Sequence, residues 1–85
     1  MKEYELDIGT PKNGYPVKQL WPVVKSAMQR YLFLEGQSPF SITYGTITTS
    51  KNLENHILTG LADIARSKGF IDFEITEKEK YVDQF

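Results

Sequence analysis

The chain has 85 residues, a formal net charge of −1 and no cysteine, and 40% of its residues are hydrophobic, 25% charged and 13% aromatic. This composition predicts one folded domain over residues 1–85 and excludes a disordered chain. It also excludes disulfides, thiolate metal sites, cysteine nucleophiles and a uniformly basic surface for nucleic acid.

The first predicted element is a strand over residues 3–8, where hydrophobic and acidic side chains alternate. A period of two gives a strand one buried face and one face in water. The hydrophobic positions are Tyr4, Leu6 and Ile8, and the acidic positions are Glu3, Glu5 and Asp7. This acidic start is unlike a signal peptide, and no hydrophobic run approaches the roughly 20 residues of a membrane span. We therefore expect a cytoplasmic protein with no membrane partner.

Residues 9–16 contain two glycines, two prolines and an Asn-Gly pair, which together predict a loop. Gly9 and Gly14 have the spacing of a phosphate-binding loop, in which lysine and then serine or threonine follow the second glycine. Tyr15 and Pro16 stand at those two positions instead, so the phosphate-neutralising and metal-binding groups are missing. The segment is therefore predicted to be a plain turn that leads from the strand into a helix.

Hydrophobic residues recur at intervals of three and four after this loop, the spacing of one face of a helix. They are Val17, Leu20, Trp21, Val24, Met28, Tyr31 and Leu32. Because Pro22 is unfavourable inside a helix, the regular helix is predicted over residues 21–35, with a short first turn allowed before it. We expect Trp21 and Tyr31 to be buried. Phe33 lies off this face and is a candidate surface contact for a partner.

β-Branched residues predict a second strand over residues 40–49. Gly45 lies in its middle and marks either a bulge in one bent strand or the turn of a hairpin. A second helix is predicted to follow, with Thr49 or Ser50 as its N-cap. Gly69 is predicted to end this helix in a Schellman motif, because a cation precedes it and a hydrophobic residue follows it.

A third strand is predicted over residues 71–75, where hydrophobic residues again alternate with acids, and residues 76–85 form either a short helix or a docking tail. The order strand, helix, strand, helix, strand predicts an α+β or small α/β fold. In this fold a single three-stranded sheet has both helices packed on one face. Strands joined through helices are normally parallel with right-handed crossovers, so we expect a parallel sheet. A hairpin at Gly45 would add a strand and make the sheet mixed.

Charge is the feature from which we predict a function. If the first and third strands are neighbours and turn their hydrophobic residues toward the helices, acidic residues project from the opposite face. These residues are Glu3, Glu5, Asp7, Asp72 and Glu74. Ordinary solvation of an open sheet would explain them, but clustered like charges work against stability.

We therefore favour a non-enzymatic protein-binding module, an adaptor or inhibitor, that docks its acidic face on a basic surface of a protein partner. That surface could be one that otherwise binds nucleic acid. Small acidic inhibitors carried by phages and mobile elements share this size and charge. Phe33 could add hydrophobic contact area to the interface.

The alternative function is a small nucleic-acid-binding domain that uses Lys18, Lys25 and Arg30 on the helix side to contact phosphates. An enzyme has less support, because His56 is the only histidine and no nucleophile motif accompanies it. We predict no catalytic residue, cofactor or metal site. Homo-oligomerisation remains open.

Overall fold

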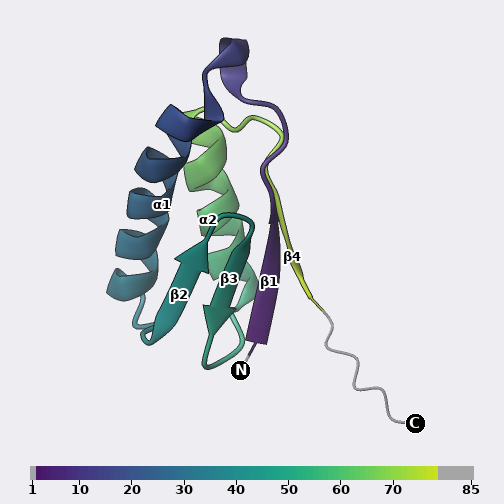
Figure 1. The fold of residues 1–85 in the computed structure, drawn as a ribbon. Helices are drawn as coiled ribbons and strands as arrows, with labels where there is room; N and C mark the ends of the chain where they lie inside the picture. Colours follow the sequence, from purple (N-terminus) through teal and green to yellow (C-terminus); the bar gives the residue numbers. More distant parts are fainter. Residues whose placement is uncertain (1, 79–85) are drawn as a thin grey trace, which may run out of the picture.

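The computed structural model describes residues 2–78, which form a four-stranded sheet with two helices on one face (Figure 1). In chain order the elements are β1 (Lys2–Asp7), the short 3-10 helix η1 (Lys12–Gly14), α1 (Val17–Leu34), β2 (Phe40–Thr43), β3 (Thr46–Thr49), α2 (Asn55–Lys68) and β4 (Glu74–Glu77). The strands lie in the order β2-β3-β1-β4, so β2 and β4 are the edges of the sheet. This α+β fold has the element order of the ferredoxin-like, or split βαβ, motif.

The sheet is antiparallel throughout, which corrects the predicted three-stranded parallel sheet and its mixed alternative. β1 pairs antiparallel with β3 and with β4, and β2 pairs antiparallel with β3. Tyr44 and Gly45 form the turn of the β2–β3 hairpin, and Gly45 has a φ of 94°, which glycine adopts without strain. The strands joined by each helix do run in the same direction. However, β3 lies between β1 and β2, and β1 lies between β3 and β4, so every neighbouring pair is antiparallel.

The first helix begins one turn earlier than the predicted start at residue 21. Pro16 occupies its N-cap with an extended backbone, and the helix runs from Val17 to Leu34 with Pro22 inside it. Pro22 and Lys18, which lies one turn before it, are both exposed. Water can therefore reach the helical carbonyl that the proline leaves without a donor, which lowers the cost of placing proline there.

The second helix begins later than predicted. Its N-cap is Glu54 rather than Thr49 or Ser50, and its first residue is Asn55. Thr49 instead ends β3, where it is 1% exposed and its Oγ1 donates a hydrogen bond to the carbonyl of Lys51 at 2.6 Å. The threonine hydroxyl is therefore used in the connection between strand and helix and not as a helix cap.

The end of the second helix matches the predicted Schellman motif. Gly69 has a φ of 135°, and the N–H of Phe70 donates back to the last turn of the helix at 3.0 Å. The strand that follows lies later than the predicted residues 71–75. Phe70 and Phe73 are both buried and a turn joins them, so Ile71 lies in this turn and is 53% exposed.

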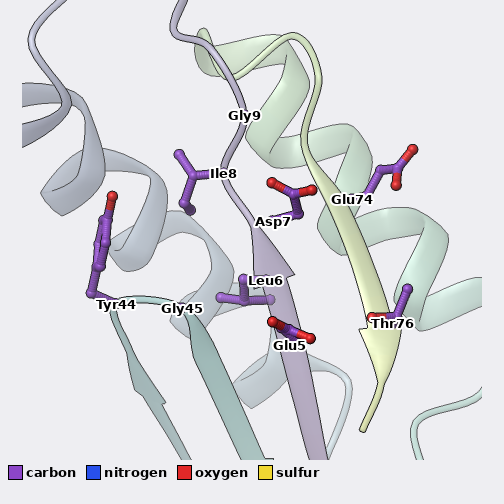
Figure 2. Close-up of a pocket in the computed structure, with 9 residues that line it drawn as sticks. All are labelled: Glu5, Leu6, Asp7, Ile8, Gly9, Tyr44, Gly45, Glu74 and Thr76. Atoms are coloured by element: carbon purple, nitrogen blue, oxygen red, sulfur yellow. The ribbon is translucent and has the colours of Figure 1, made fainter.

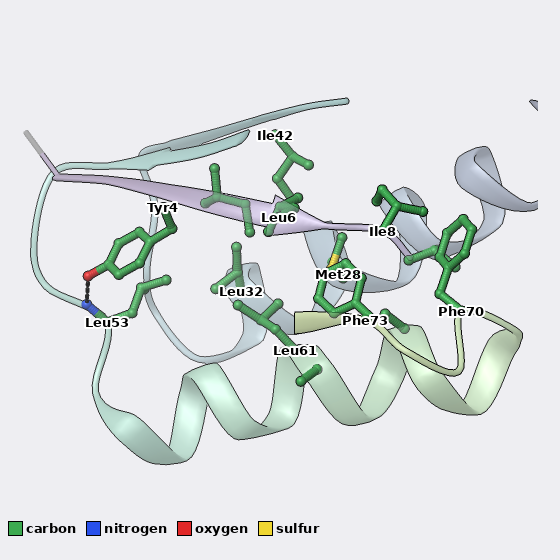
Figure 3. Packing of buried hydrophobic residues seen from close by; sticks show 14 of the residues in the cluster. Tyr4, Leu6, Ile8, Met28, Leu32, Ile42, Leu53, Leu61, Phe70 and Phe73 are labelled. Carbon is green, nitrogen blue, oxygen red and sulfur yellow. Dashed lines mark hydrogen bonds between the residues drawn. The ribbon is translucent and has the colours of Figure 1, made fainter. Parts of the chain in front are cut away.

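The hydrophobic core lies between the sheet and the two helices (Figure 3). Its buried side chains include Tyr4 and Leu6 from β1, Met28 and Leu32 from α1, and Ile57 and Leu61 from α2. The hydroxyl of Tyr4 accepts a buried hydrogen bond from the N–H of Leu53 at 2.8 Å, shown as a dashed line in Figure 3. Both helices therefore pack on one face, as predicted, and no helix within residues 2–78 covers the other face of the sheet.

The predicted helix or docking tail over residues 76–85 lies mostly outside the described residues. Residues 76 and 77 belong to β4, and residues 79–85 are not among those that the structure describes. Within residues 2–78, neither helix combines the length and hydrophobicity needed to cross a membrane.

Candidate protein-binding face of the sheet

The face of the sheet that points away from the helices carries only acidic and hydroxyl side chains at its paired positions. Directly opposed residues of an antiparallel pair project to the same side, so the register of the strands defines this face. We call the following set the outer face: Glu3, Glu5 and Asp7 on β1, Thr46 and Thr48 on β3, Ser41 and Thr43 on β2, and Glu74 and Thr76 on β4. No cation and no aromatic ring occupies any of these positions, but the N–H of Lys78 donates to the carbonyl of Glu3, which places Lys78 opposite Glu3 at the end of this face.

The structure brings together most of the acids that the sequence singled out. β1 and β4 are neighbours, and Glu3, Glu5, Asp7 and Glu74 all lie on the outer face. Asp72 does not, because it lies in the turn before β4 and not in a strand. Its Cβ is so close to Gly9 that a Cβ added there would lie only 2.7 Å away. Asp72 therefore stands at the end of the outer face, where it shares a shallow hollow with Asp7 and Glu74.

A second hollow, of about 560 Å³, opens where β1 continues past the turn of the β2–β3 hairpin (Figure 2). Its lining residues are Glu5, Leu6, Asp7, Ile8, Gly9, Tyr44, Gly45, Glu74 and Thr76. The N–H of Leu6 donates to the carbonyl of Gly45 at 2.9 Å, which holds the hairpin turn beside β1. The carboxylates of Glu5, Asp7 and Glu74 therefore lie around the same hollow.

Tyr44 also borders this hollow, and the sequence reasoning placed it in a strand and did not consider it as a contact residue. Tyr44 is 61% exposed, and its ring packs edge-on against Trp21 with the ring centroids 5.4 Å apart. The available signal was its position next to Gly45, where a hairpin turn interrupts the alternation of the strand. Because Trp21 lies on α1, this contact holds the Tyr44 ring on the side of β1 where Leu6 and Ile8 project, away from the carboxylates (Figure 2).

The outer-face carboxylates have no cation partner among residues 2–78, whose ion pairs all lie elsewhere. One ion pair does join β1 and β4: the Oε2 of Glu77 lies 2.6 Å from the Nζ of Lys2. Glu77 is directly opposite Tyr4, so its pair register places it on the side of the sheet that faces the helices. Lys78 lies opposite Glu3, and Arg66 lines the same hollow as Asp7 and Glu74, but neither cation forms an ion pair with these carboxylates among residues 2–78.

Phe33 is 67% exposed, in agreement with the prediction, but it lies on α1 and therefore on the opposite side of the sheet from the outer face. The structure does not bring it together with the acids. Trp21 and Tyr31, which were predicted to be buried, are only half-buried. Both pack against the core cluster without being fully buried in it.

The cations predicted to contact nucleic acid lie on α1, which contains no acidic residue. Lys18 and Arg30 are exposed, and Lys25 is half-buried. Since a helix turns by about 100° per residue, Lys18 and Lys25 lie on one side and Arg30 on another, so the three do not form one stripe. The helix α1 is nevertheless positively charged, while the outer face is negatively charged.

His56 lies at the start of α2 between two carboxylates. Its Nδ1 is 3.4 Å from an oxygen of Glu54, its Nε2 is 4.0 Å from an oxygen of Glu35, and its backbone carbonyl accepts a hydrogen bond from the hydroxyl of Tyr31 at 3.5 Å. Partial burial, and then the carboxylates of Glu35 and Asp63, raise the pKa of the Tyr31 phenol. This cluster joins the ends of the two helices. In the part of the chain that the structure describes, no group of histidine and acidic side chains could hold a metal ion.

Comparisons with protein-family models, with curated proteins and with solved structures found no match for this chain. The element order does not assign a function, because common folds host many unrelated activities. The outer face and its hollow are the surface features that any functional assignment must explain.

Proposed function

We propose that this protein is a non-enzymatic protein-binding module, an adaptor or inhibitor, whose outer face docks on a basic surface of a larger partner. The observation that supports this proposal most strongly is the direct opposition of Asp7 and Glu74 across β1 and β4. Like charges placed directly opposite each other destabilise a sheet. A basic partner relieves that repulsion when it binds, and complementary charge also speeds encounter and fixes orientation.

The hollow beside the hairpin offers a specific contact for such a partner. The carboxylates of Glu5, Asp7 and Glu74 line it together. A lysine or arginine side chain that entered the hollow would gain charge-assisted hydrogen bonds from these carboxylates. We therefore place the centre of the interface at this end of the outer face.

The chemistry of the outer face also opposes direct binding of RNA to the sheet. Four-stranded sheets that bind RNA stack its bases on exposed aromatic side chains. The paired positions of the outer face are acidic or hydroxyl-bearing, and carboxylates repel phosphates. A row of carboxylates instead presents negative charge as a nucleic acid does. We accordingly extend the proposal to basic surfaces that otherwise hold nucleic acid, and we place this function in the cytoplasm, where a cysteine-free domain needs no disulfides.

The test is a capture experiment with tagged protein in native lysate, performed with and without nuclease. The tested variant is Glu5→Lys, Asp7→Lys and Glu74→Lys, which reverses the charge of the hollow. The matched control is Glu35→Lys, Glu54→Lys and Asp63→Lys, which changes the net charge equally on the helix side of the molecule. All six residues are exposed.

We expect the wild type and the control to capture the same protein after nuclease treatment, and the outer-face variant to lose it. Equal capture by both variants would show that the outer face is not the interface. Loss of capture on nuclease treatment alone would show that nucleic acid, and not protein, is the ligand.

A second candidate function is nucleic-acid binding through α1, because this helix carries Lys18, Lys25 and Arg30 and no acid. Phosphate contacts are strongest at low salt, so binding to mixed DNA and RNA at about 50 mM salt is the appropriate test. Undetectable binding under that condition would remove this candidate.

A further inference from the structure

On the side of the edge strand β4 away from β1, no strand within residues 2–78 pairs with its backbone groups. The N–H of Lys78 donates to the carbonyl of Glu3 at 2.8 Å, and this bond fixes which residues of β4 point toward β1. In an antiparallel pair such residues alternate, so the backbone groups of Glu74 and Thr76 face β1. Those of Ile75 and Glu77 therefore point away from the sheet, where a further strand could pair with them.

A groove of about 380 Å³ runs beside this edge, between β4 and α2. Its lining residues are Asn55, Leu58, Thr59, Ala62 and Arg66 on α2 and Glu74, Ile75 and Thr76 on β4. Leu58 and Ile75 are half-buried and Ala62 is 6% exposed, so the floor of the groove is hydrophobic. A side chain that pointed inward from an added strand would enter this groove.

Arg66 limits how far such a strand could extend. Its Nε donates to the carbonyl of Phe73 at 3.0 Å. The arginine side chain therefore occupies the edge of the sheet just before β4 begins. The free part of the edge therefore starts at Ile75. On the outer face, Glu74 lies next to the start of this free edge, and Asp7 lies directly opposite Glu74 on the neighbouring strand β1.

We propose that β4 binds an extended basic segment of the protein partner as an added strand, a proposal that rests on the function proposed above. Side chains of adjacent residues in a strand point to opposite faces. The residue opposite Ile75 would face the hydrophobic groove, and its neighbours would lie on the outer face near Glu74. The segment that fits therefore alternates basic and hydrophobic residues, with backbone hydrogen bonds supplying affinity and the alternating pockets supplying specificity.

Charge favours this occupant over a second copy of the chain. Pairing of two β4 strands would join two outer faces, each with the carboxylates of Glu5, Asp7 and Glu74, in one continuous sheet. A basic segment instead brings positive charge next to Glu74 and Asp7. The oligomeric state of the free protein, measured by sedimentation, separates the two cases, because pairing through β4 would give a dimer.

The probe for the test is the capped peptide Lys-Val-Lys-Val-Lys-Val-Lys, compared with its isomer Lys-Lys-Lys-Lys-Val-Val-Val. The two have the same charge and composition, but only the first alternates. We expect the alternating peptide to bind about tenfold more tightly, because it alone can form the backbone bonds and fill the groove together. Amide hydrogen exchange should then slow at Ile75 and Glu77, while Glu74 and Thr76, already paired with β1, change little.

Two variants sharpen the test. Ile75→Pro removes an outward N–H without removing a bond to β1, and proline is tolerated on sheet edges, so we expect it to abolish the preference for the alternating peptide. Ile75→Val keeps the N–H and should preserve the preference. The exchange measurement on the wild type keeps the test valid if Ile75→Pro fails to fold.

The added-strand proposal would be overturned if both peptides bound equally or if neither bound. It would also be overturned if exchange at Ile75 and Glu77 did not change, or if a dimer protected these amides without peptide. Such a failure is distinguishable from failure of the proposed function. If the Glu5, Asp7 and Glu74 charge-reversal variant still loses the captured protein, docking through the outer face stands without the added strand.

Discussion

Asp7 on β1 and Glu74 on β4 are directly opposed across the sheet, and both are exposed on its outer face. Directly opposed residues that exchange backbone bonds have Cα atoms about 5.5 Å apart, close enough for like charges to repel. Neither carboxylate has a cation partner within residues 2–78. The pair is thus a local source of instability, which we attribute to the requirements of binding a basic partner.

The first prediction follows from this repulsion. Glu74→Lys places a cation opposite Asp7, and we expect it to raise the free energy of unfolding by about 0.5 kcal/mol. Urea denaturation followed by the fluorescence of Trp21, the only tryptophan, measures this change. The control is Glu77→Gln, which removes the exposed pair with Lys2 and should lower stability by no more than about 1 kcal/mol. A lower stability for Glu74→Lys would contradict the account of the outer face.

The second prediction concerns the buried hydrogen bond between Tyr4 and Leu53. Tyr4→Phe leaves the buried N–H of Leu53 without its acceptor, so we expect the free energy of unfolding to fall by about 1–3 kcal/mol. Tyr15→Phe is the control, because Tyr15 is 56% exposed and the same chemical change there should have no measurable effect. Identical denaturation midpoints for Tyr4→Phe and the wild type would show that this bond does not hold the segment before α2 against the sheet.

The third prediction concerns the contact between the two helices. A Cβ on Gly60 of α2 would overlap the hydroxyl and ring of Tyr31 on α1. Helix propensity alone would make Gly60→Ala stabilising by about 1 kcal/mol. We expect the opposite sign, a loss of about 1–3 kcal/mol from overpacking, with partial recovery when Tyr31→Leu is added. Thr59→Ala, at an exposed neighbouring position, should be close to neutral. A stabilising Gly60→Ala would mean that the helices pack differently.

Local sequence signals predicted those features of the fold that depend on residues close together in the sequence. The alternation around Tyr4, Leu6 and Ile8 defined both the buried and the acidic side of β1, and the Schellman end of α2 at Gly69 follows from its backbone requirement. Strand direction could not be predicted in this way, because a period of two is common to parallel and antiparallel strands. Gly45 allowed either a bulge or a hairpin, and the hairpin makes β2 and β3 antiparallel neighbours.

The site was predicted in part for the same reason. Glu5, Asp7 and Glu74 were found because alternation assigns them to one side of a strand. Asp72 was misplaced because the alternation of residues 71–75 resembles a strand, whereas Phe70 and Phe73 are both buried on either side of a turn. Tyr44 was missed because Gly45 was compatible with both a bulge and a hairpin, and Tyr44 lies in an exposed turn only in the hairpin.

The measurement that tests the central claim most directly is carboxylate labelling of the captured complex, read by mass spectrometry and compared with the free protein. We expect Glu5, Asp7 and Glu74 to lose reactivity in the complex because the partner covers the outer face. Glu35, Glu54 and Asp63, on the helix side, should react equally in both states. Protection of the helix-side carboxylates with unchanged labelling of Glu5, Asp7 and Glu74 would contradict the claim that this protein binds its partner through the outer face.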